Sequence, residues 1–265
     1  MQATSALEFA PTWKWWLPPF YSSYGDEVMT LYWWIFWITI VTFVLVEGAL
    51  VYFCFKYKRD PARKAVYTHG SHKLEVAWTV IPTVILVALG VFSGSTWGKI
   101  KNSADPSYPD SFETTLQITA QQFAWNVKYP GPDGSLATEA DNFTKQNVLH
   151  VPYEQIDGDG NVVRQENVRI LLTSMDVIHS FFCPVLCLKQ DAVPGYLGNV
   201  WFDVQRQSSP GADGKYFTPD DEVYEVACAE LCGIQHSKMR MELKAMPREV
   251  YEKWVAEQSA EAHKK

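Results

Sequence analysis

The chain has 265 residues, enough for one or two domains, and its formal net charge at pH 7 is −7. A nucleic-acid partner is not expected, because surfaces that bind nucleic acid are basic. The 14% aromatic content is high for an ordinary soluble protein, and much of it lies in the first hundred residues. A wholly soluble protein is therefore a poor fit to this composition.

Two apolar runs predict membrane-spanning helices. Residues 31–55 are almost wholly apolar, and aromatic residues gather near both ends, as they do at the two interfaces of a bilayer. Residues 76–97 are uncharged and apolar, and at 1.5 Å per residue they can cross a hydrocarbon layer of about 30 Å. We therefore predict a two-helix transmembrane hairpin over residues 31–98, with a buried soluble hairpin as the alternative.

The loop between these runs sets the orientation. Residues 56–73 carry six Lys or Arg residues against Asp60 alone, which predicts a cytoplasmic loop by the positive-inside rule. Both ends of the chain then lie outside, so we predict the inner (plasma) membrane of a bacterium, with residues 99–265 in the periplasm. Residues 1–30 form an outer N-terminal segment in which no signal peptide is evident, and a leader already removed stays an alternative.

Residues 99–265 have the pattern of an all-β domain. Short β-favouring segments separated by turn residues are typical of a sandwich or barrel. They are residues 115–119, 123–129, 148–151, 168–172, 200–204 and 223–226. Near the end, Pro247 and the helical spacing of Val250, Trp254 and Val255 predict a short C-terminal helix. With 24 Asp and Glu against 16 Lys and Arg, the acidity of this domain serves solubility or attracts a basic electron carrier.

A group of soft metal ligands is the most informative feature of this domain. Cys228, Cys232, His236 and Met239 form one short run, and His179 lies upstream. Thiolate, imidazole and thioether donors select copper over hard cations. Because a blue-copper site needs only one thiolate, the second cysteine predicts two copper ions bridged by both sulfurs, each also bound by one imidazole. Such a pair shares an added electron with little change in bond lengths, which suits electron relay.

Other interpretations of this run are a helix face and a zinc site. Spacings of 4, 4 and 3 would also line one side of an α-helix, but the β-favouring residues 223–226 and Gly233 favour a loop that leaves a strand. Structural zinc also uses Cys and His, although Met239 is a poor zinc ligand. A membrane-tethered copper chaperone is a third alternative, which the paired thiolates oppose.

Nearly the whole chain after residue 30 resembles subunit II of haem-copper cytochrome c oxidases. The most specific stretches are CAELCGIQHSKM at 228–239, DVIHS at 176–180 and KQDAVPG at 189–195. The resemblance implies a hairpin followed by a cupredoxin-like Greek-key barrel or sandwich with a dinuclear copper A centre. The implied metal ligands are His179, Cys228, Glu230 through its backbone carbonyl, Cys232, His236 and Met239. The Glu230 side chain is implied to reach a magnesium ion at the contact with subunit I.

The resemblance also implies a function. The chain is expected to be the electron-input subunit of a respiratory oxygen reductase, taking electrons from a cytochrome c-type donor or a neighbouring respiratory complex. It would pass them to haem in subunit I, which also holds copper B, with oxygen reduction and proton pumping on that other chain. No Cys-x-x-Cys-His haem attachment sequence occurs, so the donor is a separate protein. The alternative is the copper A subunit of a nitric oxide reductase.

Three positions near these motifs carry further hypotheses. Phe123 stands where the family usually has a tryptophan that receives electrons, so Phe123 or Trp125 is the candidate aromatic for that step. The alternative for both is a strand aromatic in the domain core. Glu75 is a candidate for the cytoplasmic mouth of a proton path, and the alternative is an acidic residue that favours the first turn of a helix.

Three more residues have open roles. Cys183 and Cys187 are extra thiols for which core packing is favoured over a disulfide, with an extra metal or redox role as the alternative. Glu47 lies inside the first apolar run, where an ionisable residue is a functional hypothesis by default. A hydrogen bond to a partner subunit is the structural alternative for Glu47.

Overall fold

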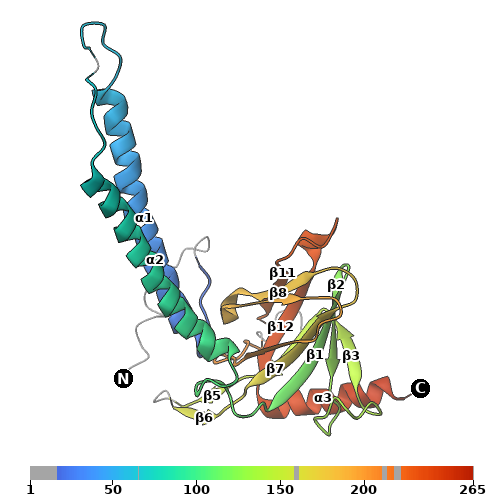
Figure 1. Ribbon diagram of the computed structural model, residues 1–265. Helices are drawn as coiled ribbons and strands as arrows, with labels where there is room; N and C mark the ends of the chain where they lie inside the picture. The colour runs from blue at the N-terminus through green and yellow to red at the C-terminus, as the bar shows by residue number, and fades with distance from the viewer. Residues whose placement is uncertain (1–16, 65, 158–160, 211–213, 218–221, 265) are drawn as a thin grey trace. The chain divides into compact units, whose positions relative to one another are not determined.

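The computed structural model describes residues 17–64, 66–157, 161–210, 214–217 and 222–264 (Figure 1). The chain divides into two compact units. One unit is Glu27–Asp105, and the other joins the N-terminal segment up to Asp26 to Pro106–Lys265.

The first unit is an antiparallel helix hairpin. Helix α1 spans Gly25–Lys56 and helix α2 spans His72–Lys101. Each contains a window with a mean hydropathy of 2.2, and none of that window is buried inside the chain. Both helices begin before and end after the predicted apolar runs, because their polar ends continue the helical backbone. The two predicted apolar helices are thus confirmed.

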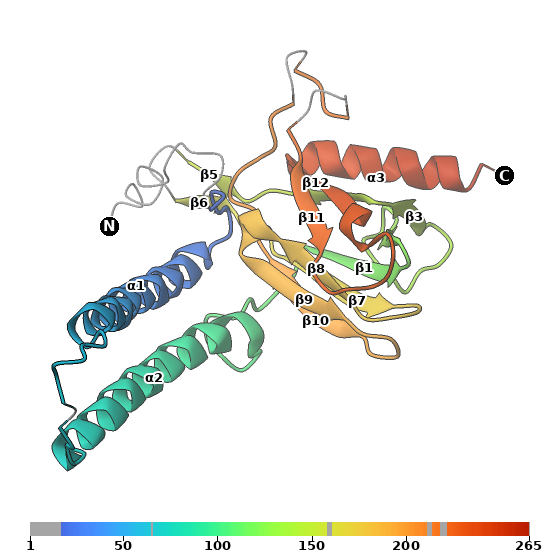
Figure 2. The ribbon, with the colours of Figure 1, turned by 90° about the horizontal axis from the view of Figure 1, so that it is seen from above.

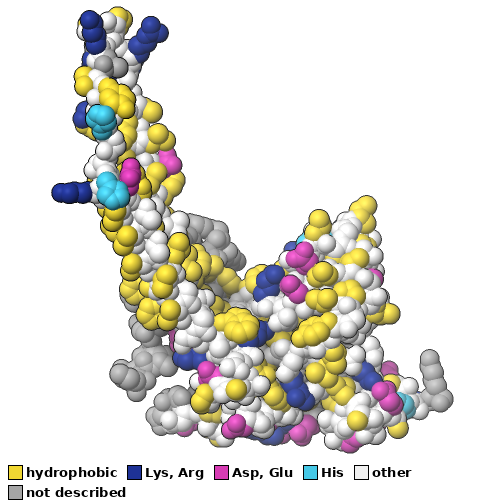
Figure 3. Space-filling model, in the orientation of Figure 1, with side chains coloured by type: hydrophobic (Ala, Val, Ile, Leu, Met, Phe, Trp, Pro, Cys, Tyr) yellow, Lys and Arg dark blue, Asp and Glu magenta, His cyan; other side chains and the backbone are white. Residues whose placement is uncertain are grey.

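The outer end of the hairpin is joined by an ion pair. Nζ of Lys99 lies 2.6 Å from Oε1 of Glu27, which links the end of α2 to the start of α1. Figure 3 shows mainly hydrophobic side chains along the described helices, with Lys and Arg side chains gathered at the connecting loop. This distribution is the one expected for a hairpin that crosses a bilayer.

The second unit is a β-sandwich. One sheet has the strand order β10-β7-β1-β2-β3 and the other has β4-β12-β11-β8-β9, with a small β5-β6 ribbon beside them (Figures 1 and 2). The first sheet is built from β1 Thr114–Gln121, β2 Ala124–Tyr129, β3 Phe143–Gln146, β7 Val168–Ser174 and β10 Gly198–Phe202. The second is built from β4 Val148–Pro152, β8 His179–Cys183, β9 Leu188–Ala192, β11 Tyr224–Cys228 and β12 Arg240–Met246. The ribbon is β5 Gln155–Ile156 and β6 Val162–Arg164.

Alternating side chains of the sheets fill the core. In β1 and β7, every second residue is buried, and Leu116, Ile118, Ile170 and Leu172 have no exposed surface. Complete burial of one such side chain contributes about 1.5–3 kcal/mol. The pairs β1·β7 and β12·β4 are parallel and join strands distant in sequence, so the sandwich is held by long-range pairing.

The six predicted strands are present as β1, β2, β4, β7, β10 and β11, with most ends displaced by one or two residues. One displacement affects the site. Strand β2 begins at Ala124, so Phe123 lies in the turn after β1 and is not a strand residue. Trp125 is a strand residue and is completely buried.

The predicted C-terminal helix is α3, Arg248–Ala262, which runs along the outside of the sandwich (Figure 2). Pro247 is its N-cap residue and so directly precedes the first turn. Trp254 packs its ring 5.0 Å from that of Tyr129, measured between ring centroids. Tyr251, and not the predicted Val250, completes the buried face with Trp254 and Val255.

The residues just before α1 are hydrogen-bonded to loops of the sandwich. The backbone N–H of Tyr21 donates to the carbonyl of Val185 at 2.7 Å, and Gln205 donates to the carbonyl of Tyr21 at 2.7 Å. Ser23 donates from its backbone and its hydroxyl to the carboxylate of Asp203, at 3.0 and 2.9 Å. We call residues 21–24 the N-terminal strap.

Candidate metal centre

Two neighbouring strands position the first ligands. His179 begins β8 and Cys228 ends β11, and these strands pair in antiparallel register with Cys228 opposite Phe181. Both side chains therefore come to the same end of the sheet. The chain then turns through a loop that carries Cys232, and a short 3-10 helix, His236–Lys238, leads to Met239 and β12. The helical alternative for residues 228–239 is wrong, because this stretch is a strand end, a loop and one short turn.

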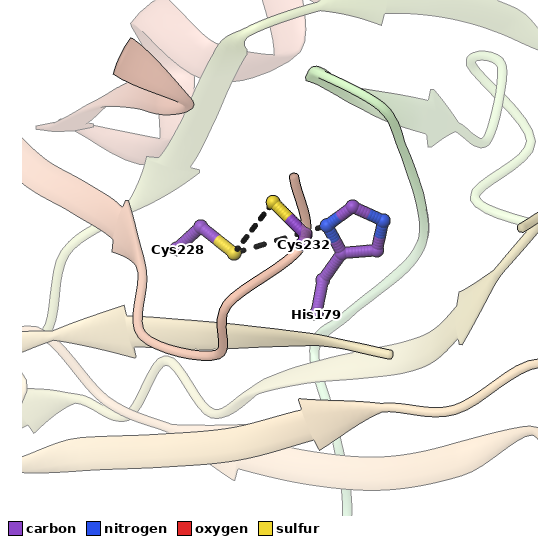
Figure 4. A group of neighbouring side chains, drawn as sticks. All are labelled: His179, Cys228 and Cys232. Carbon is purple, nitrogen blue, oxygen red and sulfur yellow. Dashed lines mark hydrogen bonds between the residues drawn. The ribbon is translucent and has the colours of Figure 1, made fainter. Parts of the chain in front are cut away.

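The two thiols lie at the centre of the group (Figure 4). Their sulfur atoms are 3.8 Å apart. Sγ of Cys228 lies 3.8 Å from Nδ1 of His179 and 3.3 Å from the carbonyl oxygen of Glu230. Sγ of Cys232 lies 3.5 Å from Nδ1 of His236 and 3.9 Å from Sδ of Met239. All six residues predicted from the sequence thus bring a donor atom to the same place.

These separations fit a metal site. Ligand bonds of about 2.0–2.3 Å place neighbouring donors of a tetrahedral ion roughly 3.3–3.8 Å apart. The ligand atoms of His179, Cys228 and Cys232 lie within 4.8 Å of one another, and all three residues are buried. Soft sulfur and nitrogen donors in this arrangement could hold copper.

We call residues 229–235, between β11 and the 3-10 helix, the metal loop. Gly233 allows this loop to pass close to the turn between β1 and β2. Its φ is +134°, a conformation that side-chain-bearing residues rarely adopt. A Cβ atom here would lie 2.9 Å from Nε2 of Gln122 and 3.0 Å from Cζ of Phe123. In return, Nε2 of Gln122 donates to the carbonyl of Cys232 at 2.6 Å. The turn between β1 and β2 thus supports the loop that carries the second thiol.

Asp176 fixes the orientation of His179. Its Oδ1 atom lies 2.8 Å from Nε2 of the imidazole, which leaves Nδ1 directed at Cys228. The backbone N–H groups of Gln122 and Val177 each donate to the same carboxylate at 2.7 Å. Partial burial opposes ionisation, but these hydrogen bonds and the imidazole lower the pKa of Asp176 to about 2. The motif at residues 176–180 contained Asp176, but the sequence did not show this role.

Four of the six candidate donor residues are buried. His179, Cys228, Cys232 and Met239 are between 0% and 8% exposed. Burial, together with the neighbouring thiol of Cys228, raises the pKa of Cys232 to about 11. Metal binding at this pair must therefore displace protons.

The two candidate aromatics occupy different positions. The indole of Trp125 lies 6.2 Å from the imidazole of His179 and 6.0 Å from the ring of Phe181, between ring centroids, with no exposed surface. Phe123 is half-buried and lies against Gly233. Of the two, Phe123 is the one at the surface. Two exposed apolar residues of the metal loop, Leu231 and Ile234, are also at this surface, with exposed fractions of 80% and 94%.

The extra thiols lie at the other end of β8. Cys183 ends that strand, and Cys187 ends the 3-10 turn Pro184–Leu186 that follows. Both are free thiols, and burial raises the pKa of Cys183 to about 12 and that of Cys187 to about 11. They are therefore separate from the group formed around Cys228.

Two acidic residues with predicted roles belong to the helix hairpin. Glu75 lies in the first turn of α2, with Oε2 3.6 Å from Nδ1 of His72 in an exposed pair. Glu47 lies in the apolar part of α1 and is exposed on the hairpin.

Two families match the sequence. Residues 114–246 match the periplasmic domain of cytochrome c oxidase subunit II, and residues 10–95 match its transmembrane domain. Cytochrome c oxidase subunit 2 of Cereibacter sphaeroides is 32% identical over 82% of this chain and 70% of that protein. The probable cytochrome c oxidase subunit 2 of Rickettsia bellii is 30% identical over 92% of this chain and 84% of that protein.

Among solved structures, the periplasmic domain of subunit II of cytochrome oxidase from Bradyrhizobium japonicum is similar at a TM-score of 0.42 and 22% identity. The structural match covers 57% of this chain and 96% of that domain. The sequence matches do not favour the nitric oxide reductase or copper chaperone alternatives. The chain belongs to the cytochrome c oxidase subunit II family and is a subunit of a haem-copper oxidoreductase.

Proposed function

We propose that this chain is the electron-input subunit of a respiratory oxygen reductase. It accepts electrons from a cytochrome c-type donor and passes them to haem in subunit I, where oxygen is reduced and protons are pumped. The hairpin anchors it in the inner membrane of a bacterium, with the sandwich in the periplasm.

The convergence of six donor atoms carries this proposal. His179, Cys228, Glu230, Cys232, His236 and Met239 would together hold two copper ions. Such a pair supplies one-electron transfer with little change in bond lengths. His179, Cys228, Cys232 and Met239 are buried, which limits the water that would otherwise reorganise around a changing charge, while His236 is half-buried and Glu230 is exposed.

The neighbouring residues hold the ligands in place. Asp176 orients the imidazole of His179, and Gln122 ties the carbonyl of Cys232 to the β1–β2 turn. Trp125 packs beneath His179 and closes the site on the core side. Ligands fixed in advance favour rapid electron transfer because little has to move when the charge changes.

For contact with the donor we propose the surface formed by Phe123 and Ile234. Phe123 lies against Gly233, next to the ligand Cys232, and Ile234 is almost fully exposed. Trp125 is a poorer candidate for direct contact because it has no exposed surface. The acidic balance of the outer domain would steer a basic donor toward it.

Two further roles complete the proposal. The side chain of Glu230 is exposed beside its own backbone carbonyl, so its carboxylate is available to a magnesium ion at the contact with subunit I. Glu75, exposed at the start of α2, would lie at the cytoplasmic mouth of a proton path.

Rapid mixing of a reduced c-type cytochrome with the oxidase that contains this chain tests the proposal. The wild-type complex is expected to oxidise the cytochrome, and Cys228→Ser is expected to abolish the fast phase. Cys187→Ser is the matched control, because that thiol lies outside the donor group. A Cys228→Ser complex that oxidises the donor as fast as wild type would overturn the proposal.

A further inference from the structure

Two buried carboxyl groups, those of Glu154 and Asp203, contact each other in the sandwich unit. Glu154 follows β4 and Asp203 follows β10, and the two residues are 5% and 2% exposed. Their side chains are hydrogen-bonded to each other, and the backbone N–H of Glu154 donates to the carbonyl of Val204 at 2.7 Å. Two carboxylates are both acceptors, so a hydrogen bond between them requires a proton on one. The pair therefore holds a proton.

No positive charge balances this pair. Among the described residues, no Lys, Arg or His forms an ion pair or hydrogen bond with either carboxyl group. Within the same part of the chain, no third acidic, histidine or cysteine side chain completes a metal-binding group with them. A proton shared between the two carboxyl groups is therefore the species that this site fits.

The other titratable groups around the pair are acidic or neutral. The charge of Glu166 acts on Glu154, but that carboxylate is itself paired with Arg164 and Arg248. On the side of the N-terminal strap, the phenol of Tyr24 is influenced by the charge of Asp203 and, more weakly, by the thiols of Cys187 and Cys183. None of these groups supplies a positive charge to replace the shared proton.

Both carboxyl groups are connected to the N-terminal strap. Ser23 donates to the carboxylate of Asp203 from its backbone at 3.0 Å and from its hydroxyl at 2.9 Å. Gln205 bonds to both sides of this contact, because its backbone N–H donates to the carbonyl of Tyr21 at 2.7 Å and its side-chain amide donates to Oε2 of Glu154 at 3.1 Å. The strap leads directly into α1. The protonation of the pair therefore acts on the segment that joins the sandwich to the hairpin.

Loss of the shared proton places two negative charges in one buried site. Burial, and then the charge of Asp203, raise the pKa of Glu154 from 4.5 to about 7. The second charge gains no donor from the strap, because both donors of Ser23 are already bound to Asp203. Opening of the strap admits water to the carboxylates and relieves their repulsion. The proton thus favours the bound strap, and this preference is lost as the pH rises through about 7.

From these contacts we propose that the Glu154–Asp203 pair is a proton-controlled latch on the N-terminal strap. One proton on the pair keeps residues 21–24 bound to the sandwich, and its release to solvent at higher pH lets them detach. The latch acts where the chain passes from the outer domain into its membrane anchor. This inference concerns the attachment of the strap, so its failure would leave the copper proposal standing.

Hydrogen exchange of the full chain in detergent, followed by mass spectrometry of peptides that cover residues 17–26, tests the proposal. Protection is expressed relative to the intrinsic exchange rate at each pH. In wild type, the protection of the strap amides is expected to fall by up to about seventyfold between about pH 5 and about pH 8, the effect of a pKa that is 4.5 in the open state and about 7 in the bound state. Amides of β1 and β7 are expected to keep their protection.

Two variants remove the titration in different ways. Glu154→Gln keeps a donor for Asp203 that cannot be lost, so the strap is expected to stay protected at every pH. Asp203→Asn removes the second charge, so its profile is also expected to be flat, with weaker protection because an amide is a poorer acceptor than a carboxylate for the donors of Ser23. Glu139→Gln is the matched control, since Glu139 is an exposed carboxyl paired with Lys128, and it is expected to behave as wild type.

The possible outcomes distinguish a latch from a general effect on stability. Strap protection in wild type that does not change with pH, or that rises with pH, would overturn the latch. Equal losses in the strap and in β1 would mean that the pair controls only global unfolding, which would also overturn it. A pH-dependent strap in both Glu154→Gln and Asp203→Asn would assign the titration to another group and contradict the proposal.

Discussion

Oδ1 of Asp176 lies 2.8 Å from Nε2 of His179, and the other ring nitrogen, Nδ1, points at Cys228. A carboxylate in this position fixes both the tautomer and the angle of an imidazole ligand. Asp176 is itself held by backbone donors of Gln122 and Val177, so the orientation of His179 depends on two different loops.

Replacement of Asp176 by Ala is expected to weaken copper binding by about tenfold to a hundredfold, the effect usual for the loss of such a partner. Without the carboxylate the imidazole can rotate, and the tautomer is no longer fixed. Competition against a copper chelator of known affinity measures the change. Asp191→Ala is the control, because Asp191 bonds to Ser180 and not to a ligand. Equal affinities of wild type and Asp176→Ala would contradict the role given to Asp176.

Gly233→Ala is expected to displace the metal loop. The new Cβ would meet Gln122 and Phe123 at 2.9–3.0 Å, and the backbone conformation itself disfavours a side chain. The free energy of unfolding is expected to fall by about 1–3 kcal/mol, and copper is expected to be retained more weakly. Gly134→Ala is the matched control, since Gly134 also has a positive φ but open space where a Cβ would stand. Copper absorption per protein after dialysis distinguishes them, and equal retention in both variants would contradict the close-contact account.

The sequence and the structure agree most closely where the pattern is local. Long, almost wholly apolar runs predicted α1 and α2, and short β-favouring segments between turns predicted β1 and β7. Strand β9 was not predicted because Lys189, Gln190 and Asp191 break the apolar pattern of an edge strand. The parallel pairing of β12 with β4 joins segments about ninety residues apart, and no local pattern specifies it.

The metal centre also has some features that the sequence predicts and others that only the fold determines. Five of the six candidate ligands were predicted from donor chemistry, because two thiols near a histidine and a methionine have few other uses, whereas Glu230 was implied only by the family resemblance. Asp176 and Gln122 were not assigned as supports, since an acid or an amide in a loop has many ordinary uses. Their roles depend on the distance between the β1–β2 turn and the metal loop, which only the fold determines.

Glu154 and Asp203 are buried carboxyl groups that influence each other, and they make the stability of the fold depend on pH. Burial, and then the charge of Asp203, raise the pKa of Glu154 to about 7 from 4.5. Between these values the folded chain retains a proton that the unfolded chain has lost, so stability falls as pH rises from about 4.5 to about 7. The full contribution is present below pH 4.5.

Thermal unfolding of the full chain in detergent, followed by tryptophan fluorescence, measures this dependence. Glu154→Gln is expected to flatten the pH profile, with a gain of about 2 kcal/mol at pH 8 relative to wild type. Glu139→Gln is the control, because Glu139 is an exposed residue paired with Lys128. An unchanged slope in Glu154→Gln would show that another group carries the pH dependence.

Phe123→Ala is expected to slow oxidation of the donor without loss of copper. The ring contacts the metal loop at Gly233, next to the ligand Cys232, so its removal opens a gap at the proposed donor surface. A decrease of about tenfold in the second-order rate constant, measured by rapid mixing, corresponds to about 1.4 kcal/mol of lost contact. Tyr196→Ala, an exposed aromatic outside the proposed surface, is the control. An unchanged rate in Phe123→Ala would remove Phe123 from the route.

The most direct measurement is the metal content of the full chain together with its electron spin resonance spectrum. The account predicts two copper ions per chain and hyperfine splitting from two equivalent copper nuclei that share one unpaired electron. Cys228→Ser or Cys232→Ser should abolish that pattern, whereas Cys54→Ser should preserve it. A single copper with the hyperfine pattern of one nucleus, or zinc in place of copper, would contradict the account.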